Sequence, residues 1–218
     1  MSDCRIVVLI SGSGSNLQAL IDACERGDID GRIVAVISNR PGVRGLERAE
    51  KHGIPAITID HTDFPDRASF DAALAERIDS YQPDLVVLAG FMRILTEDFV
   101  ARYAGRMLNI HPSRLPKYQG LHTHQRAIDA GDATHGASVH FVTAELDGGP
   151  VILQSELPIR GDHTAETLAA DLLPQEHRIY PKVVEWFCAR RLALTPNGVE
   201  MDGKLLTQPL QLAQLDGA

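Results

Sequence analysis

Short apolar runs alternate with amphipathic segments along the first half of the chain. Such runs are typical of strands buried in a parallel sheet, and they occupy residues 5–10, 33–37, 56–59, 85–88 and a stretch from Arg106 to His111. Between them, apolar residues recur at helical spacing, which predicts helices over 17–24, 46–52 and 70–81. Because strands and helices alternate, the pattern predicts an α/β fold with a doubly wound, mostly parallel sheet and helices on both faces.

The second half of the chain has a less regular pattern. Residues 112–124 are rich in Pro, Gly and His, which predicts a long loop, and two strands are predicted over 137–143 and 151–159. A helical pattern covers 164–190, and we expect Pro174 and Pro181 to interrupt it. The tail favours a hairpin around Asp202-Gly203.

Composition narrows the class of protein. A chain of 218 residues with 44% hydrophobic and 23% charged residues suits one large α/β domain, or one domain with a small appendage. The formal net charge of −8 argues against general nucleic-acid binding, which needs basic patches. The three cysteines show no CxxC spacing, so neither a disulfide framework nor a zinc cluster is indicated. Without a leader pattern or an apolar stretch near the roughly 20 residues of a spanning helix, we expect a cytoplasmic protein and no membrane partner.

The segment Asn109-Ile110-His111-Pro112-Ser113 carries the strongest chemical signal. Asn109 and His111 are two residues apart, so on a strand their side chains share one face. Pro112 stops the run, which places both residues at the carboxyl end of a strand, where open α/β sheets bind ligands. With Asp147 of Asp147-Gly148-Gly149-Pro150, they offer an amide, an imidazole and a carboxylate. These groups suffice to move an acyl group onto an amine without a metal.

The loop Ser11-Gly12-Ser13-Gly14-Ser15-Asn16 follows the first predicted strand and precedes a helix. Glycines let a backbone approach a ligand closely, and a helix N-terminus offers unpaired N–H groups to an anion. Leu17 replaces the third glycine of a dinucleotide motif, and no Gly-Lys-Ser/Thr is present, so a single phosphate fits best. The alternative is a tight turn with Ser15 as helix N-cap.

Each candidate residue also has an ordinary structural interpretation. His111 alone suits a structural histidine, and Asp147 suits a turn. Arg67 and Arg93 suit surface charges, and Glu176 suits an exposed helix position. A metal site of His111, His122, His124 and Asp147 is a further alternative, but no HExxH motif or Cys/His cluster accompanies it.

Seven motifs read together favour function over these interpretations. They are SGxGSNL from Ser11, LAGFMRIL from Leu88, LNIHPS from Leu108, LPxYxG from Leu115, GxSVHFV from Gly136, LDGGP from Leu146 and QEH from Gln175. Over residues 4–192 this ordered set resembles the 10-formyltetrahydrofolate-dependent formyltransferases, in particular the phosphoribosylglycinamide formyltransferase (GAR transformylase) family. The Asn-x-His…Asp pattern is shared across these enzymes, and the Gly-rich loop narrows the substrate.

The resemblance implies a reaction and a catalytic set. The expected activity moves the formyl group of 10-formyltetrahydrofolate to the glycyl amine of glycinamide ribonucleotide, a step of purine biosynthesis. Asn109, His111 and Asp147 would be catalytic, with Asn109 and protonated His111 donating to the developing oxyanion. His111 would also protonate N10 of the departing folate. A nearby carboxylate such as Asp147 favours the charged imidazole and can relay a proton from the amine through water.

The resemblance also implies binding residues. The ribonucleotide would be held by Gly14, Ser15, Asn16, Leu173, Pro174, Gln175 and Glu176. The folate would be held by Arg67, Met92, Arg93, Ile94, Leu95, Asn109, Thr143, Ala144, Glu145, Leu146 and Asp147. Leu172-Leu173-Pro174, which precedes Gln175-Glu176-His177, departs from the more polar, helix-compatible lead that the resemblance implies, and Pro174 removes a backbone donor. No metal is expected, and the partners are the two small molecules, without nucleic acid.

We expect a formyltransferase domain over 1–192, with a phosphate-binding half at 1–108, a folate and catalytic half at 109–192, and a tail at 193–218. Methionyl-tRNA formyltransferase adds a C-terminal domain and formyltetrahydrofolate deformylase an N-terminal one, and we expect neither here. A monomer and a homodimer both stay open. Three alternatives also stay open: a formyltransferase for another amine such as a sugar nucleotide, a metal-dependent hydrolase, and a non-catalytic phosphate-binding module.

Overall fold

The computed structural model of the protein describes residues 3–217. The chain forms two compact units, the first ending at Asn109 and the second beginning at Ile110. Strand β5 (Met107–His111) carries the chain from one unit into the next.

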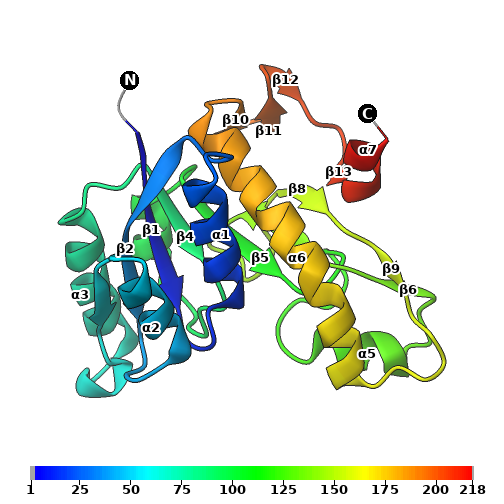
Figure 1. Cartoon of the computed structure of the whole chain (residues 1–218), viewed down its shortest axis with the longest axis horizontal. Helices are drawn as coiled ribbons and strands as arrows, with labels where there is room; N and C mark the ends of the chain where they lie inside the picture. Colours follow the sequence, from blue (N-terminus) through cyan, green and yellow to red (C-terminus); the bar gives the residue numbers. More distant parts are fainter. Residues whose placement is uncertain (1–2, 218) are drawn as a thin grey trace. The chain divides into compact units, whose positions relative to one another are not determined.

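The first unit alternates strands and helices, as the apolar pattern predicts. Its elements before β5 are β1 (Cys4–Ile10), α1 (Ser15–Glu25), β2 (Gly31–Ser38), α2 (Arg44–Lys51), β3 (Ala56–Thr58), the 3-10 helix η1 (His61–Asp63), α3 (Arg67–Asp79), β4 (Leu85–Leu88) and α4 (Glu97–Arg102). Helices α1 and α2 pack against β2, and α2 also packs against β3 (Figure 1). The short helix α4 was not predicted.

The strands of the first unit are parallel and lie in the order β5-β4-β1-β2-β3. The side chains of β1 from Val7 to Ile10 are fully buried, as in a sheet covered on both faces. The chain winds outward from β1 through β2 and β3, then returns to the other side of β1 at β4. Ligands of such sheets bind outside the carboxyl ends of the strands, where this order reverses. Here that point lies between the ends of β1 and β4, beyond the paired residues Leu9 and Leu88.

The second unit is built around one long helix and short strands. Its elements are α5 (Thr123–Asp129), β6 (Thr134–His135), β7 (Ser138–Phe141), β8 (Val151–Gln154), β9 (Leu157–Pro158), α6 (Ala165–Cys188), β10 (Leu192–Thr195), β11 (Gly198–Met201), β12 (Lys204–Leu205), β13 (Leu210–Gln211) and α7 (Leu212–Asp216). Helix α6 contacts α5 towards its N-terminal end and β10 beyond its C-terminal end (Figure 1).

The strands of the second unit are mostly antiparallel. β7 pairs with β8, and β6 pairs with β9, in antiparallel register. β10, β11 and β12 form an antiparallel meander in which Asp202-Gly203 connects the last two strands, as predicted. The tail then adds β13, which runs parallel to β8 and covers the edge of that strand. Nothing in the local sequence predicted this last pairing.

The prediction that Pro174 and Pro181 interrupt the helical pattern is wrong, because α6 continues through both. Proline removes one helical hydrogen bond and leaves the carbonyl four residues earlier without its donor. Pro174 and Ala170 are both exposed, so water can satisfy the carbonyl at the first of these positions. The buried stripe of α6 lies on another face and supplies the packing that keeps the helix intact.

Among residues 3–217, no helix combines the length and the hydropathy that crossing a membrane requires.

Candidate active site

The Gly-rich loop leaves the N-terminus of α1 open. Gly14 is the N-cap residue with φ of 72°, and no side chain caps the helix. A Cβ at Gly14 would lie 2.7 Å from Cα of Gly45, so both the backbone angle and the space demand glycine. Ser15 was considered as the N-cap, but it is the first helical residue. The first N–H groups of α1 are therefore presented without a competing side-chain acceptor, as an anion site requires.

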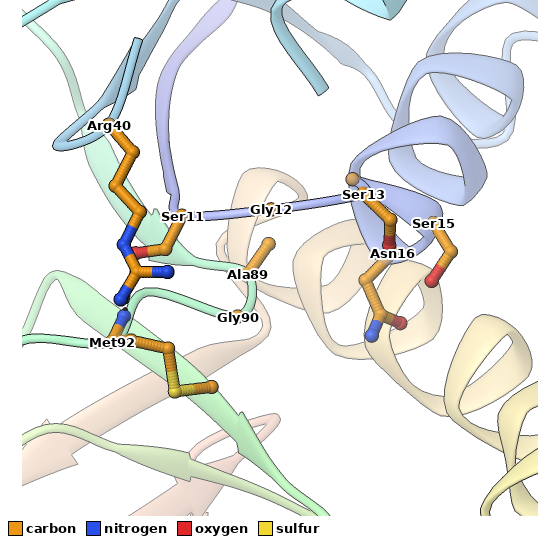
Figure 2. Close-up of a pocket in the computed structure, with 10 residues that line it drawn as sticks. Ser11, Gly12, Ser13, Ser15, Asn16, Arg40, Ala89, Gly90 and Met92 are labelled. Carbon is orange, nitrogen blue, oxygen red and sulfur yellow. Dashed lines mark hydrogen bonds between the residues drawn. The ribbon is translucent and has the colours of Figure 1, made fainter. Parts of the chain in front are cut away.

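A cavity of about 320 Å³ lies over this loop, at the point where the strand order reverses (Figure 2). It is lined by Ser11, Gly12, Ser13, Gly14, Ser15, Asn16, Arg40, Ala89, Gly90 and Met92. The hydroxyl of Ser11 joins the two loops, accepting from the Met92 N–H at 2.8 Å and donating to Oδ1 of Asn39 at 2.5 Å. The predicted phosphate residues Gly14, Ser15 and Asn16 thus share one cavity with Met92.

Arg40 is a lining residue that sequence reasoning missed. It follows β2 and extends toward Ser11 and Met92 in Figure 2. Within residues 3–217 its guanidinium has no hydrogen bond or ion pair to the protein. The signal was available, because Asn39 and Arg40 are polar residues directly after a buried strand. A free cation that lines the same cavity as the open N-terminus of α1 gives the cavity the charge that an anionic ligand needs.

The segment Met92–Leu95 has neither helical nor strand hydrogen bonding. Apart from the Met92 N–H, which donates to Ser11, its backbone groups are available to a ligand. The side chains of Met92 and Ile94 are 59% and 51% exposed. Arg93 stacks over the ring of Phe70 at 5.2 Å and is only partly exposed, so it is more than a surface charge. Arg67 begins α3 and is exposed, as its ordinary interpretation expects.

Several predicted binding residues carry buried polar atoms without a hydrogen-bond partner in the described part of the chain. These atoms are Oδ1 of Asn16, Nε of Arg93 and Oε1 of Gln175. A buried polar atom left unpaired costs about 1–3 kcal/mol. At these three predicted contacts a bound ligand would supply the missing hydrogen bonds.

Strand β5 delivers the catalytic candidates. Asn109 is partly exposed and His111 is buried, and one intervening residue, Ile110, separates them along the strand. Side chains alternate between the two faces of a strand, so Asn109 and His111 project from the same face.

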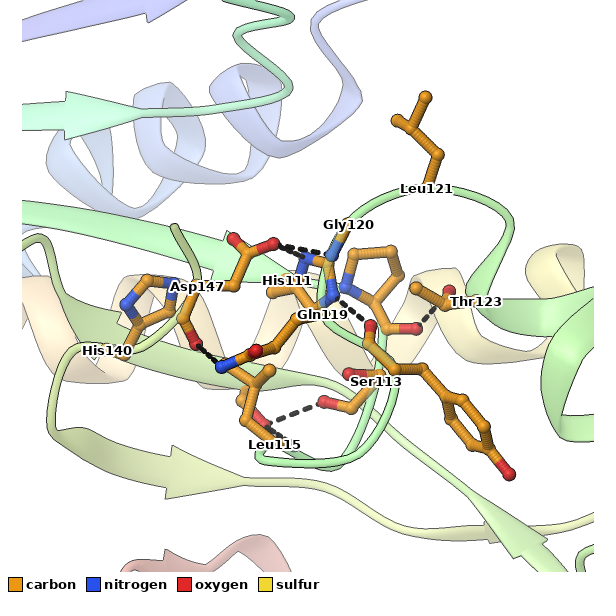
Figure 3. Close-up of polar contacts among 12 residues, drawn as sticks. His111, Ser113, Leu115, Gln119, Gly120, Leu121, Thr123, His140 and Asp147 are labelled. Atoms are coloured by element: carbon orange, nitrogen blue, oxygen red, sulfur yellow. Dashed lines mark hydrogen bonds and ion pairs between the residues drawn. The ribbon is translucent and has the colours of Figure 1, made fainter. Parts of the chain in front are cut away.

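His111 and Asp147 come together, although they are distant in the sequence. Nδ1 of His111 lies 3.5 Å from Oδ2 of Asp147, and their side chains are 8% and 10% exposed (Figure 3). Nε2 of His111 lies 2.8 Å from the carbonyl oxygen of Tyr118. The imidazole is thus held between a carboxylate and a carbonyl, and a structural histidine on an apolar face does not explain this environment.

Asp147 occupies the turn that its Asp-Gly-Gly context indicates. Its φ is 50°, and the turn is closed by the N–H of Gly148 donating to the Glu145 carbonyl. A Cβ at Gly149 would collide with the carbonyl oxygen of Phe141, so the chain needs glycine there. Within the same loop, Ala144, Glu145 and Leu146 are exposed and Thr143 is partly exposed. The turn and the functional interpretation of Asp147 are therefore compatible.

The predicted ribonucleotide segment Leu173, Pro174, Gln175 and Glu176 lies in the middle of α6. The interpretation of Glu176 as an exposed position is wrong, since the residue is 8% exposed. Burial raises the pKa of its carboxyl to about 7. The helical spacing in the sequence indicates this burial, because Glu176 lies four residues after Leu172 and four before Tyr180, both of which are buried.

The histidines form no metal-binding cluster within residues 3–217. No group of three or more His, Cys, Asp or Glu side chains there could hold a metal ion. His111, His122, His124 and Asp147 thus do not converge as one ligand set. His124 instead contacts His135 through Nδ1 and Nε2 at 3.0 Å. Burial, aided by the neighbouring His124, lowers the pKa of His135 to about 4.

The sequence matches the family model described as formyl transferase over residues 4–184. The chain belongs to the formyl transferase family. It is 54% identical to the phosphoribosylglycinamide formyltransferase of Escherichia coli (strain K12), over 93% of this chain and 95% of that protein. It is 48% identical to the corresponding Haemophilus influenzae protein, over the same shares of each chain.

Among solved structures, this formyl transferase is similar to the phosphoribosylglycinamide formyltransferase from Coxiella burnetii in complex with CHES. The TM-score is 0.91 at 50% sequence identity, covering 96% of this chain and 100% of that one. The family predicted from the seven motifs and the α/β fold class are confirmed.

Proposed function

We propose that the protein transfers the formyl group of 10-formyltetrahydrofolate to the glycyl amine of glycinamide ribonucleotide. The products are formylglycinamide ribonucleotide and tetrahydrofolate, in de novo purine biosynthesis. One observation carries the proposal: the His111–Asp147 pair, in a chain 54% identical to a phosphoribosylglycinamide formyltransferase.

The chemistry needs no acylated residue. The amine nitrogen attacks the formyl carbon, forming a C–N bond and a tetrahedral intermediate whose oxygen carries the developing charge. Asn109 and the Nδ1–H of protonated His111 donate hydrogen bonds to that oxygen, since Nε2 of His111 faces the Tyr118 carbonyl, and each such donor is worth about 100-fold to 1000-fold in rate. The bond from the formyl carbon to N10 then breaks as His111 delivers a proton to N10. Asp147 orients the charged imidazole and takes up, through water, the proton that the amine loses.

The ribonucleotide is recognised by its phosphate and by its sugar and amine end. The phosphate accepts hydrogen bonds from the open N-terminus of α1 at Gly14, Ser15 and Asn16. The guanidinium of Arg40 balances its negative charge. Leu173, Pro174, Gln175 and Glu176 contact the sugar and amine end, where the unpaired Oε1 of Gln175 accepts a donor from the ligand.

The folate is held by backbone groups and one terminal charge. The irregular segment Met92, Arg93, Ile94 and Leu95 offers its backbone and two exposed apolar side chains to the folate ring. Thr143–Asp147 provides a second loop, and exposed Arg67 pairs with the folate's carboxylate tail. The folate is a co-substrate that carries the formyl group, and the residues named above bind and orient it.

A substrate panel tests this proposal. The purified protein is incubated with 10-formyltetrahydrofolate and, in separate reactions, glycinamide ribonucleotide, an amino-sugar nucleotide and free glycinamide. We expect transfer to glycinamide ribonucleotide alone at appreciable rate, unchanged by a chelator. Preferred transfer to the sugar nucleotide, or no transfer to any amine, would overturn the proposal.

A further inference from the structure

The segment Tyr118-Gln119-Gly120 contacts both members of the catalytic pair. Nε2 of His111 lies 2.8 Å from the carbonyl oxygen of Tyr118, and the N–H of Gly120 donates to Oδ2 of Asp147 at 2.8 Å. The Gln119 amide donates to the backbone carbonyl of Asp147 at 3.3 Å (Figure 3). Three consecutive residues thus fix the positions of the imidazole and the carboxylate together.

Both ring nitrogens of His111 face oxygen atoms that only accept. One is the Tyr118 carbonyl at Nε2, and the other is the Asp147 carboxylate, 3.5 Å from Nδ1. A neutral imidazole has one N–H and one lone pair, so one nitrogen would oppose an oxygen lone pair. The short contact at Nε2 therefore calls for an N–H on Nε2, which leaves Nδ1 facing Asp147 and the proposed reaction.

The position of this carbonyl depends on the Tyr118 side chain. The phenol hydroxyl donates to Oδ2 of Asp132 at 2.6 Å, and Nζ of Lys117 donates to the same oxygen at 3.1 Å. The guanidinium of Arg126 lies over the Tyr118 ring at 5.2 Å and donates to the Gln119 carbonyl at 2.6 Å.

The backbone of Tyr118 needs this anchoring. Its φ is 56°, in the left-handed region that side chains other than glycine rarely adopt. Such a conformation persists only where surrounding contacts hold it. The Tyr118 hydroxyl donates its hydrogen bond to Asp132. Loss of this hydrogen bond should therefore let Tyr118 leave the left-handed conformation and move its carbonyl away from His111.

We propose that Tyr118 and Asp132 are positioning residues for His111: their hydrogen bond holds the Tyr118 carbonyl against Nε2 and keeps the ring aligned with Asp147. The inference rests on the proposed function for its effect on turnover. Its geometric part stands independently of any reaction.

Tyr118→Phe removes the donor of the anchoring bond and Asp132→Leu removes its acceptor, each with little change in side-chain size. We expect kcat for formyl transfer to fall between about 10-fold and 100-fold in each variant, because catalysis is sensitive to misplacement of about 1 Å. The KM of both substrates should stay within about twofold, and the double variant should lose little more than either single variant. Tyr81→Phe is the matched control, since within residues 3–217 the Tyr81 hydroxyl makes no hydrogen bond, and it should retain wild-type kcat.

A second readout needs no turnover. The Nε2–H proton of His111, observed by NMR in protein labelled with ¹⁵N-histidine, should be detectable in the wild type and Tyr81→Phe but broadened away in Tyr118→Phe. An unchanged proton signal in Tyr118→Phe, or a rise in KM as large as the fall in kcat, would overturn the positioning role. Absence of wild-type formyl transfer would instead overturn the proposed function, and the NMR comparison would still decide this one.

Discussion

At the residue scale, the candidate site holds two kinds of ionisable group: a histidine and a carboxylate that face each other, and a buried carboxyl without a charged partner among the described residues. Asp147 and His111 are buried beside one another, whereas Glu176 is buried in α6 among apolar neighbours. Desolvation raises the pKa of Glu176 to about 7, since no cation within residues 3–217 offsets it. Burying this carboxyl lowers the stability of the folded protein. The same carboxyl can donate or accept a hydrogen bond at the sugar or amine of a ligand.

Glu176→Gln should therefore stabilise the protein in a pH-dependent way. The folded carboxyl has a pKa of about 7 against an ordinary 4.5, so its contribution to folding is intact below pH 4.5 and is lost as pH rises through 7. The shift corresponds to about 3 kcal/mol at most. Urea unfolding should show the Gln variant more stable by up to about that amount at pH 8, with the difference shrinking toward pH 4.5. An equal difference at both pH values would contradict the account, and exposed Glu50→Gln serves as the control.

Arg40 tests the charge of the cavity over the Gly-rich loop. Arg40→Met should raise the Kd for glycinamide ribonucleotide about tenfold, since a hydrogen bond to a charged group contributes about 1.5 kcal/mol or more. Folate binding should change little. Arg44→Met removes the same charge from an exposed position that does not line the cavity. If calorimetric titration shows equal weakening in both variants, Arg40 has no specific role.

At the scale of elements, the sequence pattern predicted those helices, strands and turns that depend on residues close together in the chain. The buried strands of the first unit, the helices between them and the Asp202-Gly203 hairpin follow from apolar spacing and turn residues. Helix α6 was predicted in place but wrongly interrupted, because its packing outweighs two prolines. Strand β13 was missed, since its pairing with β8 joins segments distant in sequence and leaves no local signal.

The N-terminus of α1 gives a direct test of the Gly-rich loop. Gly14→Val places a branched side chain where φ is 72° and where Cα of Gly45 is 2.7 Å from the new Cβ. We expect the affinity for the ribonucleotide to fall by at least about tenfold, because the N–H groups of the loop would move away from the ribonucleotide's phosphate. Folate affinity should persist in the same titration. Gly161→Val, with open space around its Cβ, is the control, and equal loss of both ligands in Gly14→Val would indicate misfolding.

At the scale of the whole molecule, the candidate site was only partly within reach of the sequence. The ordered motifs predicted the family and the identities of Asn109, His111 and Asp147. They could not predict that the Asp147 carboxylate lies 3.5 Å from the imidazole, because that distance depends on the turn at Asp147 and on the Tyr118–Gly120 segment. The motifs did not predict Arg40, because it follows β2, a strand separate in sequence from the Gly-rich loop whose cavity it lines.

The most direct test of the central claim is steady-state kinetics of His111→Ala and Asp147→Ala with saturating glycinamide ribonucleotide. His52→Ala, a histidine paired with Glu25 on the surface, is the control. The account predicts that kcat falls about 100-fold to 10,000-fold in His111→Ala and substantially in Asp147→Ala, while both KM values stay within a few-fold. Turnover that is unchanged in both variants would contradict it.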